Sequence, residues 1–131
     1  MRELCVTSYS TFKATQENPS PVVVDNLKFL AEHVLQPLRD HIMKPLTINS
    51  GYRSSALNNY VKGAKNSYHL YGCAADIKMD NWEMAYRCAA FVTGYLIPFN
   101  ECIICKLGPT LWLHVAFRRG DTKHYVGFKE Y

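Results

Sequence analysis

The sequence has no apolar run long enough to cross a membrane. A spanning helix needs roughly 18–20 consecutive apolar residues, and the longest apolar stretches here are interrupted by Arg87, Pro98 and Glu101. The N-terminal residues lack the apolar segment of a classical signal peptide, so we expect synthesis in the cytoplasm. Internal repeats and low-complexity tracts are also absent, which excludes solenoid and fibrous architectures.

Strong charge of either sign is lacking as well. The 131 residues are 48% hydrophobic and carry a net charge of +4, which excludes a disordered chain and suits one domain spanning residues 1–131. The basic residues are scattered, and no nucleic-acid-binding motif accompanies them. We therefore expect a monomer with no nucleic-acid partner, although so mild a charge also suits an anionic polymer such as a cell wall.

The cysteines do not form a recognisable metal or disulfide framework. There are five, an odd number, which favours reduced thiols. Cys102 and Cys105 form a lone C-x-x-C, but a structural zinc site would need a second ligand pair at matching spacing. We interpret them as small hydrophobic residues in a strand.

Hydrophobic periodicity predicts an α+β domain with an antiparallel sheet and helices packed on one face. Two long helices are expected, the first kinked by Pro37, and the second opened by a capping box of Asp80 and Glu83 with Trp82 and Leu96 on its apolar face. The three C-terminal strands should form an antiparallel meander. The predicted helices are 21–43, 54–62 and 81–95, and the predicted strands are 46–53, 73–79, 101–106, 111–117 and 124–129.

Three residues form a candidate metal site. Strand 73–79 places Asp76 opposite its apolar face, and strand 111–117 does the same for His114. His69 lies in the loop that leads into the first of these strands, where Gly72 allows the loop to turn back. Two imidazoles and a carboxylate suit Zn²⁺ with an open fourth position. A chance grouping is the alternative, since five histidines and eleven acids offer many triplets.

Longer motifs surround these three residues. Ser50-Gly51-Tyr52-Arg53-Ser54 is followed by Leu57-Asn58 and Gly63-Ala64, then by S-x-H-x-x-G-x-A-A-D-I over 67–77, and finally by Trp112-Leu113-His114-Val115. Together they closely resemble the M15 family of zinc peptidases, which contains D-alanyl-D-alanine carboxypeptidases and phage endolysin endopeptidases. The resemblance is strongest to small single-domain phage and prophage members. It spans about residues 18–117.

The resemblance implies a fold related to the Hedgehog signalling domain, with one zinc ion held by His69, Asp76 and His114. It implies hydrolysis of peptidoglycan stem peptides, and release to the cell wall during phage lysis as a route past the missing signal peptide. Arg53 would hold a substrate carboxylate or carbonyl, and Ser67 would bind substrate or orient the site. The alternatives are that Arg53 pairs with an acid and that Ser67 caps its loop.

Other aromatic and acidic residues complete the predicted site. Tyr52 and Trp112 are candidate groove residues, with core packing as the alternative for the tyrosine. Many family members place Glu or His two or three positions before the last zinc ligand, but here those positions are Trp112 and Leu111. Glu101 is the remaining candidate for the general acid or base, unless it is an ordinary exposed strand-end acid. The missing base leaves a second hypothesis, a non-catalytic zinc-bearing module that binds cell wall or protein.

Overall fold

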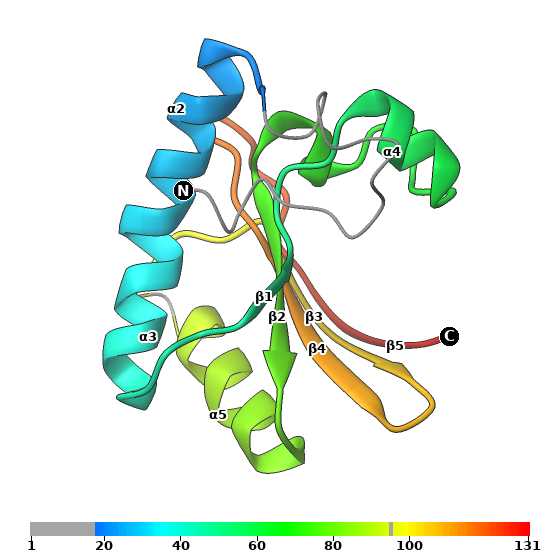
Figure 1. Cartoon of the computed structure of the whole chain (residues 1–131). Coiled ribbons are helices and arrows are strands. Elements are labelled where there is room, and N and C mark those ends of the chain that lie inside the picture. The colour runs from blue at the N-terminus through cyan, green and yellow to red at the C-terminus, as the bar shows by residue number, and fades with distance from the viewer. Residues whose placement is uncertain (1–17, 95) are drawn as a thin grey trace.

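The computed structural model describes residues 18–94 and 96–131, which form a five-stranded sheet with helices (Figure 1). The strands β1 (Ile48–Ser50), β2 (Ala74–Met79), β3 (Glu101–Leu107), β4 (Thr110–Ala116) and β5 (Tyr125–Glu130) lie in the order β1-β2-β4-β3-β5. The helices α2 (Pro21–Leu30), α3 (Gln36–Ile42) and α5 (Trp82–Thr93) pack on one face. The short helix α4 (Ser55–Tyr60) lies across the sheet from α2 and α3. The predicted α+β class is confirmed.

The first predicted helix is continuous but changes its winding before the proline. Ser20 caps its start by accepting a hydrogen bond from the backbone N–H of Val23. Between α2 and α3 the turn η3 (Ala31–Leu35) is a π-helix, in which the N–H of Gln36 bonds to the carbonyl of Ala31. This wider turn ends two residues before Pro37, which has no N–H to donate. The sequence signal for a kink thus corresponds to a π-bulge.

The second long helix begins one residue later than its predicted capping box. Asn81, not Asp80, accepts a hydrogen bond from the N–H of Met84, while Asp80 pairs with Lys44 at 2.7 Å. The buried face is narrower than expected, because Trp82 is 38% exposed and Leu96 lies beyond the helix end at 81% exposed. The buried residues of this helix are Ala85, Cys88 and Val92, and the partly buried Met84, Ala89 and Phe91 pack against the same core.

The C-terminal strand corrects the predicted antiparallel meander. β5 runs parallel to β3, with Tyr125 beside Glu101. A meander would place β5 against β4, but β4 already pairs with β2 on one side and β3 on the other. β4 ends at Ala116, opposite Glu101. The connection 117–124 therefore leaves β4 beside the start of β3, and β5 then runs along the free edge of β3 in the same direction.

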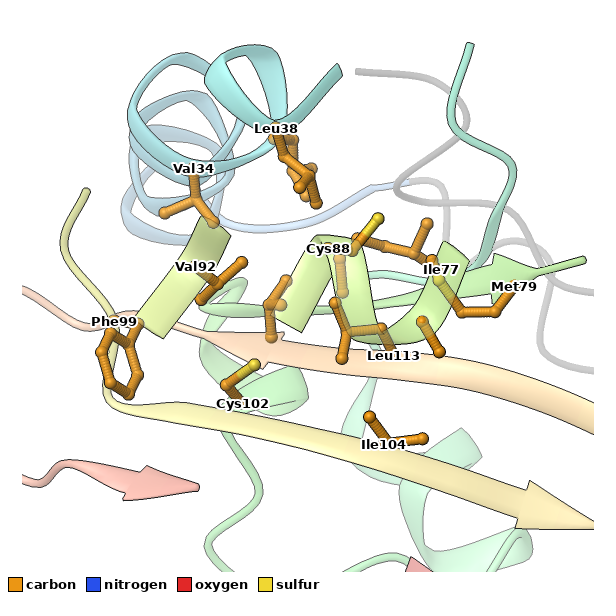
Figure 2. Close-up of a cluster of buried hydrophobic side chains, with 14 of the residues drawn as sticks. Val34, Leu38, Ile77, Met79, Cys88, Val92, Phe99, Cys102, Ile104 and Leu113 are labelled. Carbon is orange, nitrogen blue, oxygen red and sulfur yellow. The ribbon is translucent and has the colours of Figure 1, made fainter. Parts of the chain in front are cut away.

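The core lies between the sheet and the helices α2, α3 and α5 (Figure 2). Val34 and Leu38 reach it from the first helix, Cys88 and Val92 from α5, and Leu113 from β4. Helical and strand periodicity together account for these contacts, since each element presents one apolar face. The opposite face of the sheet is left for polar side chains.

The described cysteines are buried free thiols, as the sequence predicted for the C-x-x-C pair. Cys102 and Cys105 both belong to β3, where an odd spacing sends them to opposite faces. Cys102 belongs to the core cluster, and Cys105 lies on the groove side. They therefore cannot share a metal ion or a disulfide. Cys5 lies outside the described residues.

Within the described ranges, no helix combines the length and the apolar character needed to cross a membrane.

Candidate metal centre and its groove

His69, Asp76 and His114 converge on the polar face of the sheet. Asp76 and His114 are direct partners across β2 and β4, and strand periodicity had predicted that they share one face of the sheet. His114 Nδ1 lies 2.9 Å from Asp76 Oδ1, and His69 Nε2 lies 3.3 Å from Asp76 Oδ2. One ligand atom from each of the three lies within 4.8 Å of the others. The predicted triad is therefore brought together in space.

His69 is oriented by the turn that carries it. The 3-10 turn η4 (Tyr68–Tyr71) ends at Gly72, which adopts a left-handed conformation with φ 72°. The Nδ1 of His69 lies 2.7 Å from the carbonyl oxygen of Gly51, so Nδ1–H is the donor, and in the neutral ring Nε2 carries the lone pair. That lone pair is on the side of Asp76. A ligand histidine held through its second nitrogen is typical of metal sites.

The donor set suits a transition metal with nitrogen and oxygen ligands. Burial opposes the charge on Asp76, but the two histidines more than offset this and hold its pKa below its usual range. Burial also opposes the charge on His114, yet hydrogen bonds to Asp76 and Glu101 raise its pKa to about 9. Two imidazoles and one carboxylate leave a fourth position open in a tetrahedral site. The residues thus fit a catalytic type of zinc centre, provided that His114 loses its proton.

The triad lies in a groove of about 770 Å³. One wall is the loop 61–67 that follows α4, and the opposite wall comes from β3, β4 and β5. Among the described residues that line it, the groove carries five cationic side chains and two carboxylates. The cations are Arg53, Lys62, Lys65, Lys123 and Lys129, and the carboxylates are Asp76 and Glu101.

Arg53 lines this groove and is held by an amide. Its Nη1 donates a hydrogen bond of 2.9 Å to Asn58 Oδ1, and the Nδ2 of Asn58 donates to the carbonyl of Ala64 at 3.0 Å. Within residues 18–94 and 96–131, no carboxylate forms an ion pair with Arg53 at 4 Å or less. Burial lowers its pKa, with Asp76 opposing. The alternative that an acid neutralises Arg53 is not seen there.

Asn58 and Gly63, for which the sequence indicated no functional role, complete this arrangement. Asn58 is only 2% exposed, although an asparagine on a short helix gives no sequence signal of function. A Cβ on Gly63 would lie 2.1 Å from Asn58 Oδ1 and 2.5 Å from Arg53 Nη1. Glycine therefore leaves room for the Arg53–Asn58 pair. The spacing of the two motifs was visible in the sequence, but this close approach was not.

The remaining predicted binding residues have different surroundings. Ser67 lines the groove, and its Oγ accepts a hydrogen bond of 3.2 Å from the N–H of His69, which caps the turn. Trp112 lines the groove and stacks on Tyr131, with ring centroids 5.6 Å apart. Tyr52 instead packs against the core cluster. Its neighbour Arg53 faces the groove, and successive residues of an extended segment point to opposite sides.

Glu101 lies on the groove face beside the triad. Its Oε1 is 2.9 Å from His114 Nε2, and its Oε2 is 2.8 Å from Lys123 Nζ. The hydrogen bond to His114 is the main cause that lowers the pKa of Glu101. Burial raises the pKa and the hydrogen bond to Lys123 lowers it further, so that the pKa is about 2. With its side chain 15% exposed, it is not an ordinary exposed strand-end acid.

The loop 117–124 that carries Lys123 is organised by a buried amide. Asn100 is fully buried, and its Nδ2 donates to the carbonyls of Asp121 and Lys123 at 3.1 and 2.8 Å. Its Oδ1 accepts from the N–H of Arg118 at 2.7 Å. The hydroxyl of Tyr68 donates to the Asp121 carboxylate and so ties the same loop to η4. The sequence alone gave Asn100 no role.

Comparison with known proteins agrees with this arrangement. A segment of 45 residues is 53% identical to the zinc D-Ala-D-Ala carboxypeptidase of Streptomyces albus G; it covers 33% of this chain and 17% of that protein. The family model described as Peptidase M15 matches residues 2–99, which include His69 and Asp76 but end before His114. Because that match covers most of the chain, the protein belongs to the peptidase M15 family.

Proposed function

We propose that the protein is a zinc-dependent peptidase that hydrolyses peptidoglycan stem peptides, with His69, Asp76 and His114 as its zinc ligands. The observation that carries the proposal is the convergence of these three donors in a groove that also contains Arg53. Bound zinc supplies Lewis acidity, which polarises a peptide carbonyl and acidifies water. The relative from Streptomyces albus G is named for the same metal and for D-Ala-D-Ala as its substrate.

The groove favours a peptide that carries a free carboxylate. Arg53 presents a planar set of donors, of which Nη1 is bound to Asn58, and a guanidinium binds carboxylates through two parallel hydrogen bonds. The excess of cationic side chains around the groove favours an anionic substrate in general. The acidic stem peptide of bacterial cell walls fits both features. An endolysin-type role in phage lysis is the setting that we propose for it.

Hydrolysis also needs a group that takes a proton from water. Of the groove-lining residues that the structure describes, Glu101 is the carboxylate outside the proposed ligand set, and the sequence predicts it for this role. Both of its oxygens already accept hydrogen bonds, from His114 and Lys123. To act as a base, Glu101 would have to release one of them. This supports the second candidate, a non-catalytic zinc-bearing binding module with the fold of the Hedgehog signalling domain.

The two candidates are separated by metal analysis combined with a peptidase assay. We expect about one zinc per chain after dialysis, and release of D-alanine from a synthetic peptide that ends in D-Ala-D-Ala. His69→Ala should lose both, whereas His33→Ala, which changes an exposed helix histidine, should lose neither. Stoichiometric zinc without cleavage of this peptide or of whole peptidoglycan would favour the binding module. No bound zinc, together with unchanged cleavage by His69→Ala, would refute the proposed site.

A further inference from the structure

Each histidine of the triad has one ring nitrogen toward Asp76 and the other toward a hydrogen-bond acceptor. For His69 the acceptor of Nδ1–H is the carbonyl of Gly51 at 2.7 Å. For His114 the nitrogen toward Asp76 is Nδ1, at 2.9 Å, and Nε2 lies 2.9 Å from Glu101 Oε1. The two rings therefore have matching arrangements. In each, the partner outside the triad determines which nitrogen can bind a metal.

We propose that Glu101 is a positioning residue, which holds His114 with Nδ1 free for the metal, and that it is not the proton acceptor for water. The inference rests on the proposed zinc site. A neutral imidazole carries one N–H, so a proton held on Nε2 by Glu101 leaves the Nδ1 lone pair available. A carboxylate behind a ligand histidine also makes that ligand more basic.

Glu101 is in turn fixed by groups on either side of it. Its Oε2 accepts from Lys123 Nζ at 2.8 Å, so neither oxygen lacks a hydrogen bond. Lys123 belongs to the loop that Asn100 holds through three side-chain hydrogen bonds. The backbone of Glu101 is pinned between β4 and β5, since it pairs with both Ala116 and Tyr125. A carboxylate held in this way is suited to orienting the His114 ring. It is less suited to taking a proton from water, because neither oxygen is free.

The register of β3 gives the same result. Glu101 lies opposite Ala116, two residues beyond His114 on β4, whereas Ile103 lies directly opposite His114. Residues 101 and 103 share the groove face by strand alternation. The Glu101 side chain therefore reaches His114 diagonally across the β3–β4 pair, on the side of the ring away from Asp76. This places it behind the ligand rather than facing it across the metal position.

The test compares Glu101→Gln and Glu101→Ala with the wild-type protein and with Glu130→Ala. The last variant removes another acid that is paired with a lysine. Glu130 lies 3.2 Å from Lys106 Nζ, and neither residue lines the groove. Zinc affinity is measured by competition with a chromophoric chelator, so it does not depend on hydrolysis. The visible spectrum of the cobalt-substituted protein reports the ligand geometry. Thermal unfolding of each variant verifies that it is folded.

We expect Glu101→Ala to weaken zinc affinity about 10- to 100-fold. Glu101→Gln should remain within about threefold of wild type and keep the cobalt spectrum, because the amide oxygen still accepts from Nε2–H. Glu130→Ala should change neither. At saturating zinc, the peptidase activity of Glu101→Gln should stay within tenfold of wild type.

Two results would overturn the assignment. The first is wild-type zinc affinity in Glu101→Ala, because it would mean that Glu101 does not hold the ligand. The second is wild-type zinc affinity in Glu101→Gln together with an activity loss of 10²-fold or more, the typical contribution of a general base. If no variant, wild type included, cleaves peptide, the proposed function fails while the affinity series still tests the role of Glu101.

Discussion

Replacing Gly63 by alanine should damage substrate binding without affecting the metal. Gly63 does not have positive φ, so its backbone conformation is open to any residue. The obstacle is space, because the new methyl group would lie 2.1 Å from Asn58 Oδ1 and 2.5 Å from Arg53 Nη1. Such contacts cannot persist, and the methyl group must displace the amide, the guanidinium or both.

The expected magnitude follows from the hydrogen bond that is lost. A hydrogen bond to a charged group contributes about 1.5–3 kcal/mol. If Arg53 anchors the substrate carboxylate only in its observed position, the same free energy corresponds to roughly a 10- to 100-fold loss in kcat/KM. The free energy of unfolding should fall by about 1–3 kcal/mol, because the buried Asn58 loses a partner. A compatible Gly→Ala change would instead stabilise by about 0.4–1 kcal/mol.

The assay combines urea denaturation, steady-state hydrolysis of a D-Ala-D-Ala peptide and zinc competition. Gly94→Ala is the matched control, because its Cβ would meet no atom closer than 3.1 Å. We expect wild-type zinc affinity in both variants and reduced kcat/KM in Gly63→Ala alone. If Gly63→Ala unfolds with the free energy of the wild-type protein and its kcat/KM stays within twofold of wild type, the Arg53–Asn58 pair does not position the substrate.

Further predictions concern the loop, the thiols and the metal. Asn100→Ala removes three hydrogen bonds of about 1 kcal/mol each and should lower the free energy of unfolding by about 3 kcal/mol in urea titrations; a loss below 1 kcal/mol would contradict its role. Burial raises the pKa values of the described thiols, so peptide mass spectrometry after alkylation should find them protected until urea unfolds the chain; they are Cys73, Cys88, Cys102 and Cys105. Zinc affinity should rise about tenfold per pH unit from pH 7 to about 9, the pKa of metal-free His114, and then level off. In the metal-free protein, this raised pKa contributes stability that is full below the unfolded pKa of about 6.5 and is lost as the pH rises through about 9. A flat zinc profile would show that His114 holds no proton to displace.

Strand alternation predicted the part of the site that depends on backbone geometry alone. The faces of strands 73–79 and 111–117 were correctly assigned, and Asp76 and His114 share the polar face, where they also pair directly. The register between two strands cannot be read from alternation, but the common polar face can. Adding His69 required the loop to turn back at Gly72, whose left-handed conformation does this.

The errors concern features set by tertiary contacts. β5 lies along β3 because both sides of β4 are already paired, which no local pattern reveals. Asn81 is the helix cap in place of Asp80, whose carboxylate pairs with a lysine 36 residues away. Periodicity placed Trp82 on the buried face of its helix, and the motif placed Tyr52 in the groove. The exposure of each side chain depends instead on which elements lie against it.

The residues that sequence reasoning missed act through other residues. Asn58 and Gly63 shape the surroundings of Arg53, and Asn100 holds the loop that supplies Lys123. Each role requires close approach of segments from different elements. Motif spacing identifies the side chains that perform chemistry, but the structure is needed to find those that hold them.

Mass spectrometry of purified peptidoglycan tests the central claim most directly. Zinc-loaded protein is incubated with the polymer, and the masses of the released and the remaining stem peptides are measured. We expect stem peptides shortened at a peptide bond, and no shortening with Asp76→Ala or after removal of zinc. Intact stem peptides in the presence of protein that holds one zinc per chain would contradict this claim.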